Sequence, residues 1–187
     1  MFLICGLGNP GRKYVNTRHN VGFDLIEKLL DKYNFSSLKK DKQKELYSGK
    51  IGTYNCILMK PLTYMNLSGI PVKKILNFYK INKNKLYIIH DDLDLEISKV
   101  KIKIGGGNGG HNGLVSIDDA IGKNYNRIRI GIDHPGSKTL VSSYVLSKFS
   151  KDEIKIIDKK LNNISDFFEL ALKDTGLFLT RLADKKK

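Results

Sequence analysis

The chain opens with the stretch Phe2-Leu3-Ile4-Cys5-Gly6-Leu7-Gly8-Asn9-Pro10-Gly11. The apolar run at its start is typical of a buried strand. After the glycines, a polar segment continues to His19-Asn20, where apolar residues begin to recur with the period of a helix. The stretch therefore predicts a strand, a loop and a helix, as in an α/β protein. Loops of this kind, at the carboxyl ends of strands, often carry binding and catalytic groups.

The same glycines match the dinucleotide-binding pattern Gly6-x-Gly8-x-x-Gly11. In that pattern the third glycine lies where a helix already packs on the strand. Here Pro10-Gly11 is a turn dipeptide, and residues 12–18 have no apolar helical face. No second strand ends in an acid at the distance that the pattern requires. We therefore expect this loop to bind no nicotinamide or flavin cofactor.

The composition indicates an ordinary globular protein. The 187 residues are 41% hydrophobic and 28% charged, and no apolar run approaches membrane-spanning length. We expect one domain over residues 1–187, with a solvated basic tail at about 183–187 and no signal peptide. Cys5 and Cys56 lie in apolar runs without metal-ligand spacing. They predict buried, reduced thiols in a cytoplasmic protein.

The charge balance points to a polyanionic partner. The chain has 33 lysines and arginines against 19 acidic residues, a formal net charge of +14. A surplus of this size on a small domain favours binding to nucleic acid. Because lysine, asparagine and isoleucine are all abundant, codon bias would produce the same surplus, and charge alone leaves the partner open.

The other apolar patterns predict strands that alternate with helices, which gives an α/β sandwich. Helices are expected from a cap at Asn20 to Tyr33, after Asn66, after the glycine loop, and over 141–149 and 152–172. Strands are expected over 46–51 and 54–59 as a hairpin, and over 86–89, 100–104 and 127–132, while 35–44 is expected to be a mobile connection. The expected inner faces are Ile70, Ile75, Leu76 and Tyr79 in the second helix and Ile156, Ile157, Leu161, Ile164, Phe167 and Phe168 in the last.

His19 is the best candidate for a general base. An imidazole near its free pKa can take a proton from water at neutral pH, although a single histidine in a loop is more often merely exposed. Asp91 directly follows a buried strand. A carboxylate there could fix the tautomer of His19 and raise the basicity of its other nitrogen. The alternative for Asp91 is a turn or capping residue.

Asn9, Asn66 and Asn112 suggest a second task at the same edge of the sheet. Amide side chains offer donors and an acceptor without charge, so they can hold peptide groups or a developing oxyanion. A single asparagine in a loop usually serves only to form a turn.

A metal site is the competing interpretation of the acidic residues. Asp91, Asp92, Asp94 and Glu96 lie close together in the sequence, but a calcium-loop glycine is missing. Magnesium needs only one or two carboxylates and phosphate oxygens, so this alternative stays open at this point.

Six motifs together resemble the bacterial peptidyl-tRNA hydrolases, in the order of that family. They are Gly6-Leu7-Gly8-Asn9-Pro10-Gly11 with Tyr14, Thr17-Arg18-His19-Asn20, Lys60-Pro61-x-Thr63-Tyr64-Met65-Asn66-x-Ser68-Gly69, His90-Asp91-Asp92-Leu93-Asp94, Gly109-Gly110-His111-Asn112-Gly113 and Arg127-x-Arg129-x-Gly131-Ile132. The resemblance implies a monomeric single-domain α/β sandwich with a mixed, mostly parallel twisted central sheet flanked by helices.

The resemblance also implies an activity and its residues. The protein would hydrolyse the ester that joins a peptide to tRNA, with no cofactor, metal or membrane, and so recycle tRNA from stalled translation. His19 would be the base, oriented by Asp91, and Asn9 would complete the catalytic set. The residues implied for substrate binding are Tyr14, Tyr64, Met65, Asn66, His111 and Asn112, and those implied for the acceptor stem and 3′ end of tRNA are Lys103, Arg129 and Lys138.

The chain departs from the family pattern at Asn108, where many relatives have a small residue, and at Asp133, where they have glycine. These departures put the affinity for tRNA in doubt rather than the catalytic centre. Two other function classes stay open here. One is an RNA-binding protein without catalysis on the same fold, and the other is a metal-dependent phosphoesterase.

Overall fold

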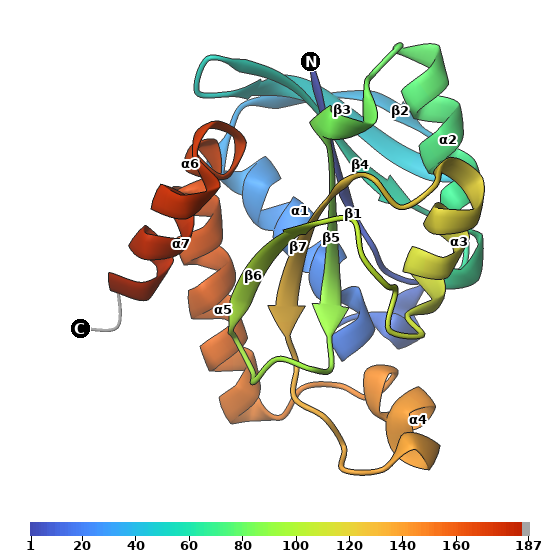
Figure 1. Cartoon of the computed structure of the whole chain (residues 1–187), viewed down its shortest axis with the longest axis vertical. Helices are drawn as coiled ribbons and strands as arrows, with labels where there is room; N and C mark the ends of the chain where they lie inside the picture. Colours follow the sequence, from blue (N-terminus) through green and yellow to red (C-terminus); the bar gives the residue numbers. More distant parts are fainter. Residues whose placement is uncertain (185–187) are drawn as a thin grey trace.

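One sheet of seven strands forms the centre of the computed structural model, which describes residues 1–184. The strands are β1 (Phe2–Gly6), β2 (Phe35–Lys40), β3 (Lys44–Ile51), β4 (Tyr54–Pro61), β5 (Leu86–Asp92), β6 (Val100–Ile104) and β7 (Asn126–Gly131). Their order across the sheet is β2-β3-β4-β1-β5-β7-β6 (Figure 1). β4, β1, β5 and β7 run parallel, and β2, β3 and β6 pair antiparallel with their neighbours. This confirms the predicted mixed sheet with a parallel centre.

Helices cover both faces of the sheet (Figure 1). They are α1 (Val21–Lys32), α2 (Gly69–Phe78), α3 (Asn112–Ile121), α4 (Val141–Val145), α5 (Lys151–Asp166), α6 (Phe168–Lys173) and α7 (Thr175–Asp184). α1, α5, α6 and α7 pack on one face, and α2 and α3 pack on the other. α4 lies apart, beyond the carboxyl ends of β5 and β7.

The apolar start of the chain divides its side chains between the two cores. Phe2 and Ile4 of β1 lie in the core under α1 and α5, whereas Leu3 and Cys5 lie in the core under α2 and α3. Successive residues of a strand point to opposite faces of the sheet. A strand buried on both faces therefore has the continuous apolar sequence that predicted it.

Two glycines allow α1 to lie directly on the sheet. A Cβ atom on Gly6 would collide with the carbonyl oxygen of Gly22, and one on Gly22 would lie 2.5 Å from the carbonyl oxygen of Ile89. Gly11 differs, because it has a φ of 105° and no atom within 4 Å of where its Cβ would be. It therefore forms a turn, and no helix packs on the strand at this glycine.

The prediction for residues 35–44 was wrong. Instead of a mobile connection, Phe35–Lys40 forms the edge strand β2, which pairs with β3. β2 is exposed along most of its length, so its sequence lacks the alternation of apolar residues that marks a half-buried strand. The hairpin of β3 and β4 around Gly52 is confirmed.

Several helix predictions need correction. Ile70 and Ile156, expected inside, are 47% and 46% exposed, while Val72 is fully buried. The helix expected over 152–172 breaks at Phe167, where α5 ends and α6 begins, and the one expected over 141–149 ends at Val145. Asn20 precedes α1, but its side chain does not cap the helix. The basic tail expected at about 183–187 lies from residue 185 onward outside the described residues.

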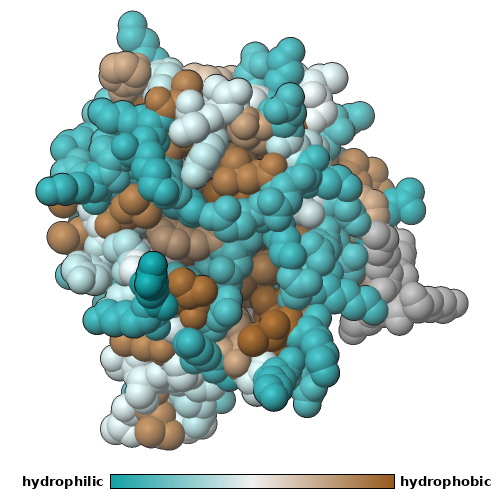
Figure 2. All heavy atoms as spheres, turned by 180° about the vertical axis from the view of Figure 1, so that it is seen from behind, coloured by the Kyte–Doolittle hydropathy of each residue, from teal (hydrophilic) through white to brown (hydrophobic). Residues whose placement is uncertain are grey.

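Hydrophilic residues cover most of the face seen in Figure 2, and apolar residues show between them in separate patches. Over residues 1–184, no helix combines the length and the apolar character needed to span a membrane. Cys5 and Cys56 are buried and free, as predicted.

The contact between α1 and the sheet leads to a prediction for stability. Replacing Gly22 by alanine should lower the free energy of unfolding by about 1–3 kcal/mol, because the methyl group would meet backbone atoms that cannot rotate away. Urea unfolding of the purified variant measures this change. Gly107→Ala is the matched control, because its methyl group would have no atom within 4 Å. Equal midpoints for Gly22→Ala and the parent would show that α1 can move without cost.

Candidate active site

A cleft of about 1100 Å³ opens at the carboxyl end of β5. Its walls come from the loop after β1, the turn after β4, the end of β5, the glycine loop before α3, and α4. Every residue that the sequence predicted for the site lines this one cleft: Asn9, Tyr14, His19, Tyr64, Met65, Asn66, Asp91, Lys103, His111, Asn112, Arg129 and Lys138. Segments from far apart in the sequence are thus brought together at one edge of the sheet.

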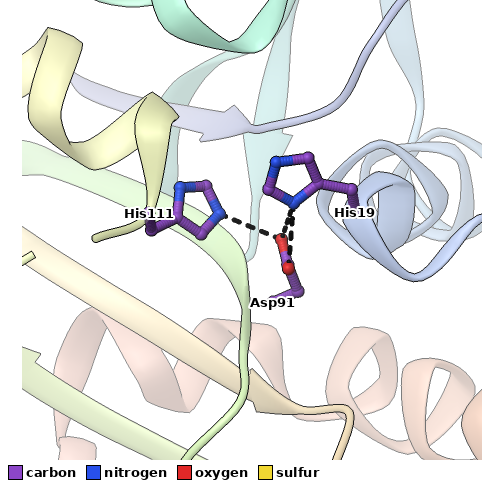
Figure 3. Close-up of side chains that lie close together, drawn as sticks. All are labelled: His19, Asp91 and His111. Atoms are coloured by element: carbon purple, nitrogen blue, oxygen red, sulfur yellow. Dashed lines mark hydrogen bonds and ion pairs between the residues drawn. The ribbon is translucent and has the colours of Figure 1, made fainter. Parts of the chain in front are cut away.

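His19 and Asp91 bond to each other inside this cleft. His19 lies in the 3-10 helix η2 (Arg18–Asn20), and Asp91 lies near the end of β5. Nδ1 of His19 is 2.9 Å from each carboxylate oxygen of Asp91 (Figure 3). Nδ1 is therefore the donor, and the other ring nitrogen, Nε2, has no hydrogen-bond partner within the described residues and keeps its lone pair.

The pKa values of this pair move in opposite directions. Burial lowers the pKa of His19, but the charge of Asp91 and the hydrogen bond to it outweigh burial, so the pKa lies above its ordinary value. Burial raises the pKa of Asp91, but the electrostatic attraction of His19 and His111 and the hydrogen bonds from their N–H groups hold it well below the usual range. Asp91 thus stays ionised while His19 becomes a stronger base.

His111 bonds to the same carboxylate from the opposite side. Its Nε2 is 3.0 Å from Oδ1 of Asp91 (Figure 3). Its Nδ1 accepts hydrogen bonds from the backbone N–H groups of Gly113 and Leu114. The ring therefore caps the amino end of α3. The rings of His19 and His111 lie 4.8 Å apart between centroids.

His90 is a third histidine of the cluster, to which sequence reasoning gave no role. It is 3% exposed, and its Nδ1 donates to the carbonyl oxygen of Asp91 at 2.7 Å. Burial lowers the pKa of His90 to about 3, so the ring is neutral. Its position directly before Asp91 was the only signal in the sequence.

A metal ion is the other group that such a cluster suggests. Ligand atoms of His19, Asp91 and His111 lie within 4.8 Å of one another. However, both ring nitrogens that face Asp91 carry protons in the hydrogen-bond network, and a metal needs their lone pairs. Asp92, a ligand in the magnesium alternative, instead pairs with Arg129. The arrangement of donors fits the hydrogen-bonded cluster better than a metal site.

Asn9 is held rigidly by its neighbours. Its backbone N–H and carbonyl oxygen bond to the side chain of Asn20 at 2.8 and 3.0 Å, and its own Oδ1 accepts from the N–H of Met65 at 2.9 Å. This leaves the amide NH₂ of Asn9 without a partner among the described residues. Asn20, predicted as a helix cap, has the different task of fixing Asn9.

The other predicted substrate contacts line the cleft in two ways. Asn66 and Asn112 are exposed, and their amides bond to no described residue. Tyr14 and Tyr64 meet edge to face, with centroids 6.5 Å apart. Met65 is only 4% exposed and packs in the core beside α3, so most of its side chain serves structure.

The three predicted basic residues differ in their availability. Arg129 donates from Nε to Asp92 at 2.5 Å, so part of its charge is already neutralised. Lys103 of β6 and Lys138, in the turn before α4, are exposed and form no ion pair within residues 1–184.

The two departures from the family pattern have local structural roles. Asn108 bonds to Asp118 at 3.2 Å and accepts from Gly110, which ties the glycine loop to α3. Asp133 has a φ of 63° and accepts from the N–H of Ile97 at 2.9 Å.

Arg18 is an anchor that sequence reasoning missed. The guanidinium is buried, stacks on Tyr144, and donates to Ser147, to the carbonyl oxygen of Lys148 and to both carboxylate oxygens of Glu153. Arg18 directly precedes His19, so these bonds hold the segment after α4 close to the loop that carries His19. Its place in the motif next to His19 was the only available signal.

A histidine held by a buried carboxylate, beside a cleft with free amides, is the arrangement of an enzyme that activates water. Fold and site together define a hydrolase of α/β architecture. The family model described as Peptidyl-tRNA hydrolase matches residues 3–187, so the chain belongs to the peptidyl-tRNA hydrolase family, as its motifs predicted.

Relatives agree with this assignment along nearly the whole chain. The peptidyl-tRNA hydrolase of Rickettsia prowazekii (strain Madrid E) is 50% identical over 173 residues, 92% of this chain and 94% of the relative. That of Rickettsia canadensis (strain McKiel) is 47% identical over 175 residues, 93% and 95% of the two chains. The crystal structure of peptidyl-tRNA hydrolase from Acinetobacter baumannii matches with a TM-score of 0.91 at 39% identity, covering 97% of this chain and 94% of that one.

The neutral, buried His90 leads to a prediction for stability against pH. Its pKa falls from 6.5 in the unfolded chain to about 3 in the folded protein, so between these values the unfolded state binds the extra proton. Stability is therefore lost as the pH falls through this window, by up to roughly 1.4 kcal/mol per pH unit. Urea unfolding at several pH values should show a shallower slope in His90→Gln than in the parent. His134→Gln, at an exposed histidine, is the control and should keep the parental slope.

Proposed function

We propose that the protein cleaves the ester between a peptide and the terminal ribose of tRNA by means of a water molecule that His19 deprotonates. The observation that carries this proposal is the 2.9 Å contact of Nδ1 of His19 with both oxygens of Asp91, which leaves Nε2 to act as the base. Membership of the family supplies the substrate class.

The reaction follows from this geometry. Nε2 of His19 takes a proton from water, and the water oxygen forms a bond to the ester carbonyl carbon. Asp91 stabilises the imidazolium that results. The tetrahedral intermediate then collapses, the bond to the ribose oxygen breaks, and the imidazolium returns its proton to that oxygen. Because His19 must be neutral to begin, activity should rise as the pH rises through its raised pKa.

The amide of Asn9 is a fitting donor for the developing oxyanion. It is fixed through Asn20 and Met65, so little reorganisation is needed when the charge develops. The amides of Asn66 and Asn112 hold the peptide, and Tyr14, Tyr64 and His111 line its path. Neutral amides suit a peptide bond better than the free ammonium group of an unacylated aminoacyl ester.

The tRNA partner binds through phosphates near the cleft. Lys103 and Lys138 offer exposed cations beside the reacting centre, and Arg129 adds a partly neutralised one, so they face the acceptor stem and 3′ end. The protein acts as a monomer of one domain in the cytoplasm, where tRNA and reduced cysteines occur together.

The first test is to replace His19 by alanine. Loss of a general base should lower kcat on an N-acetylated aminoacyl-tRNA about 10²–10⁴-fold, because the water is no longer deprotonated. The dissociation constant for the same tRNA should stay within about threefold of the parental value, since phosphate contacts supply most affinity. Asn163→Ala, on α5, is a control distant from the cleft. An inactive parent with intact tRNA affinity would favour the alternative of an RNA-binding protein without catalysis.

The second test is to remove metal ions. The proposed reaction uses no metal, so dialysis against chelator followed by an assay in excess chelator should leave the initial rate unchanged. A large loss of rate, restored by Mg²⁺ or Zn²⁺, would contradict the mechanism and favour a metal-dependent esterase. The assay should include His19→Ala, so that any residual metal-dependent rate is seen separately.

A further inference from the structure

We propose that His111 is a positioning residue for the catalytic pair, and that α3 fixes the ring tautomer by which its Nε2–H holds Asp91. The resemblance to the family implied only substrate binding for His111, as a residue that lines the cleft. The catalytic consequence of this inference rests on the proposed function, whereas the tautomer is a property of the free protein.

The hydrogen bonds of His111 assign its proton. Nδ1 accepts from the N–H of Gly113 at 3.1 Å and from the N–H of Leu114 at 3.4 Å. A ring nitrogen that accepts carries no hydrogen, so the proton of the neutral ring is on Nε2. Nε2 lies 3.0 Å from Oδ1 of Asp91, which can only accept.

The opposite tautomer would break all of these contacts at once. A hydrogen on Nδ1 would face the N–H groups of Gly113 and Leu114, and the lone pair of Nε2 would face a carboxylate oxygen. The first turn of α3 would also lose an acceptor for N–H groups that have no partner within the helix. The helix terminus therefore selects the form of His111 that donates to Asp91.

The second donor has two effects on Asp91. The carboxylate is held from both sides, by His19 and by His111, so its orientation is fixed in a side chain that is only 2% exposed. Oδ1 is shared between the two histidines, whereas Oδ2 bonds only to His19. His111 thereby withdraws part of the negative charge that stabilises protonated His19.

The ionisable groups around this cluster are few. His19 contacts Asp91 and the ring of His111, whose centroid lies 4.8 Å from that of His19. The ring of His111 also contacts that of His90, with centroids 5.1 Å apart and an angle of 76° between the ring planes. The guanidinium of Arg18 turns away to Glu153. Loss of the Nε2–H of His111 should therefore act on His19 chiefly through Asp91.

The tautomer can be tested without any substrate. The chain has four histidines, so a two-dimensional ¹⁵N–¹H spectrum of the rings can resolve each one after assignment by single replacement. At neutral pH, Nδ1 of His111 should be the unprotonated nitrogen and Nε2 the protonated one. A spectrum with the proton on Nδ1 would overturn the inference, whatever the activity of the protein.

The consequence can be tested with His111→Asn. Asparagine is a good helix cap, but its amide ends short of Asp91, so the variant keeps the cap and loses the donor. The pH at which His19 loses its proton in the free variant should rise by roughly 0.5–1 unit. The acid limb of kcat/KM should move in the same direction, and kcat should fall on the order of tenfold because Asp91 is less fixed.

His134→Asn is the matched control. His134 also accepts a backbone N–H with its Nδ1, from Gly136 at 3.0 Å, but no carboxylate of the described residues bonds to its ring. Its replacement should leave the acid limb where it is. The opposing result is that His111→Asn raises only KM and leaves both the acid limb of kcat/KM and the titration of His19 unchanged. In that case His111 only contacts substrate, and the inference fails. The His19 titration decides this even if the hydrolase assay itself gives no turnover.

Discussion

The carboxylate of Asp91 is the group on which the rest of the site depends. A buried charge is costly unless hydrogen bonds and opposite charges compensate it. Here His19 and His111 donate to it from two sides, at 2.9 and 3.0 Å. One donor comes from the loop after β1 and the other from the start of α3, so satisfying one buried acid ties three distant parts of the chain together. The bond to His19 also raises the pKa of that ring, as the proposed general base requires.

The sheet brings these three parts within reach. β1 and β5 are parallel neighbours, with Gly6 opposite Ile89, so both strands end at the same edge. Leu7 continues the pairing with a bond to the carbonyl oxygen of Ile89, and Gly22 lets α1 lie close behind. The loop that carries His19 therefore lies next to the end of β5. The register of two strands and the small size of Gly22 set the distance between His19 and Asp91.

The sequence best predicted those elements whose residue pattern has a single structural explanation. The buried strands were evident because a short continuous apolar run bounded by turn residues is typical of a strand covered on both faces, and His19 and Asp91 followed from polar residues at strand ends. β2 was missed because an exposed edge strand needs no apolar side chains. Arg18 was overlooked and Asn20 was misjudged for a different reason. Their partners lie up to 135 positions away or across a loop, and only the folded chain decides them.

The surface charge also has to be judged pair by pair. The chain carries a net charge of +14, yet Arg129 is paired with Asp92 beside the cleft. Asp133 accepts a backbone N–H from Ile97 and so has a structural use. Among the described residues that line the cleft, Lys103 and Lys138 are exposed lysines without an ion pair, and they lie on separate walls. Cations on both walls attract a phosphate chain between them, and steering of this kind falls with ionic strength. Under the proposed function, the net charge brings tRNA to the protein, and these two lysines direct it toward His19.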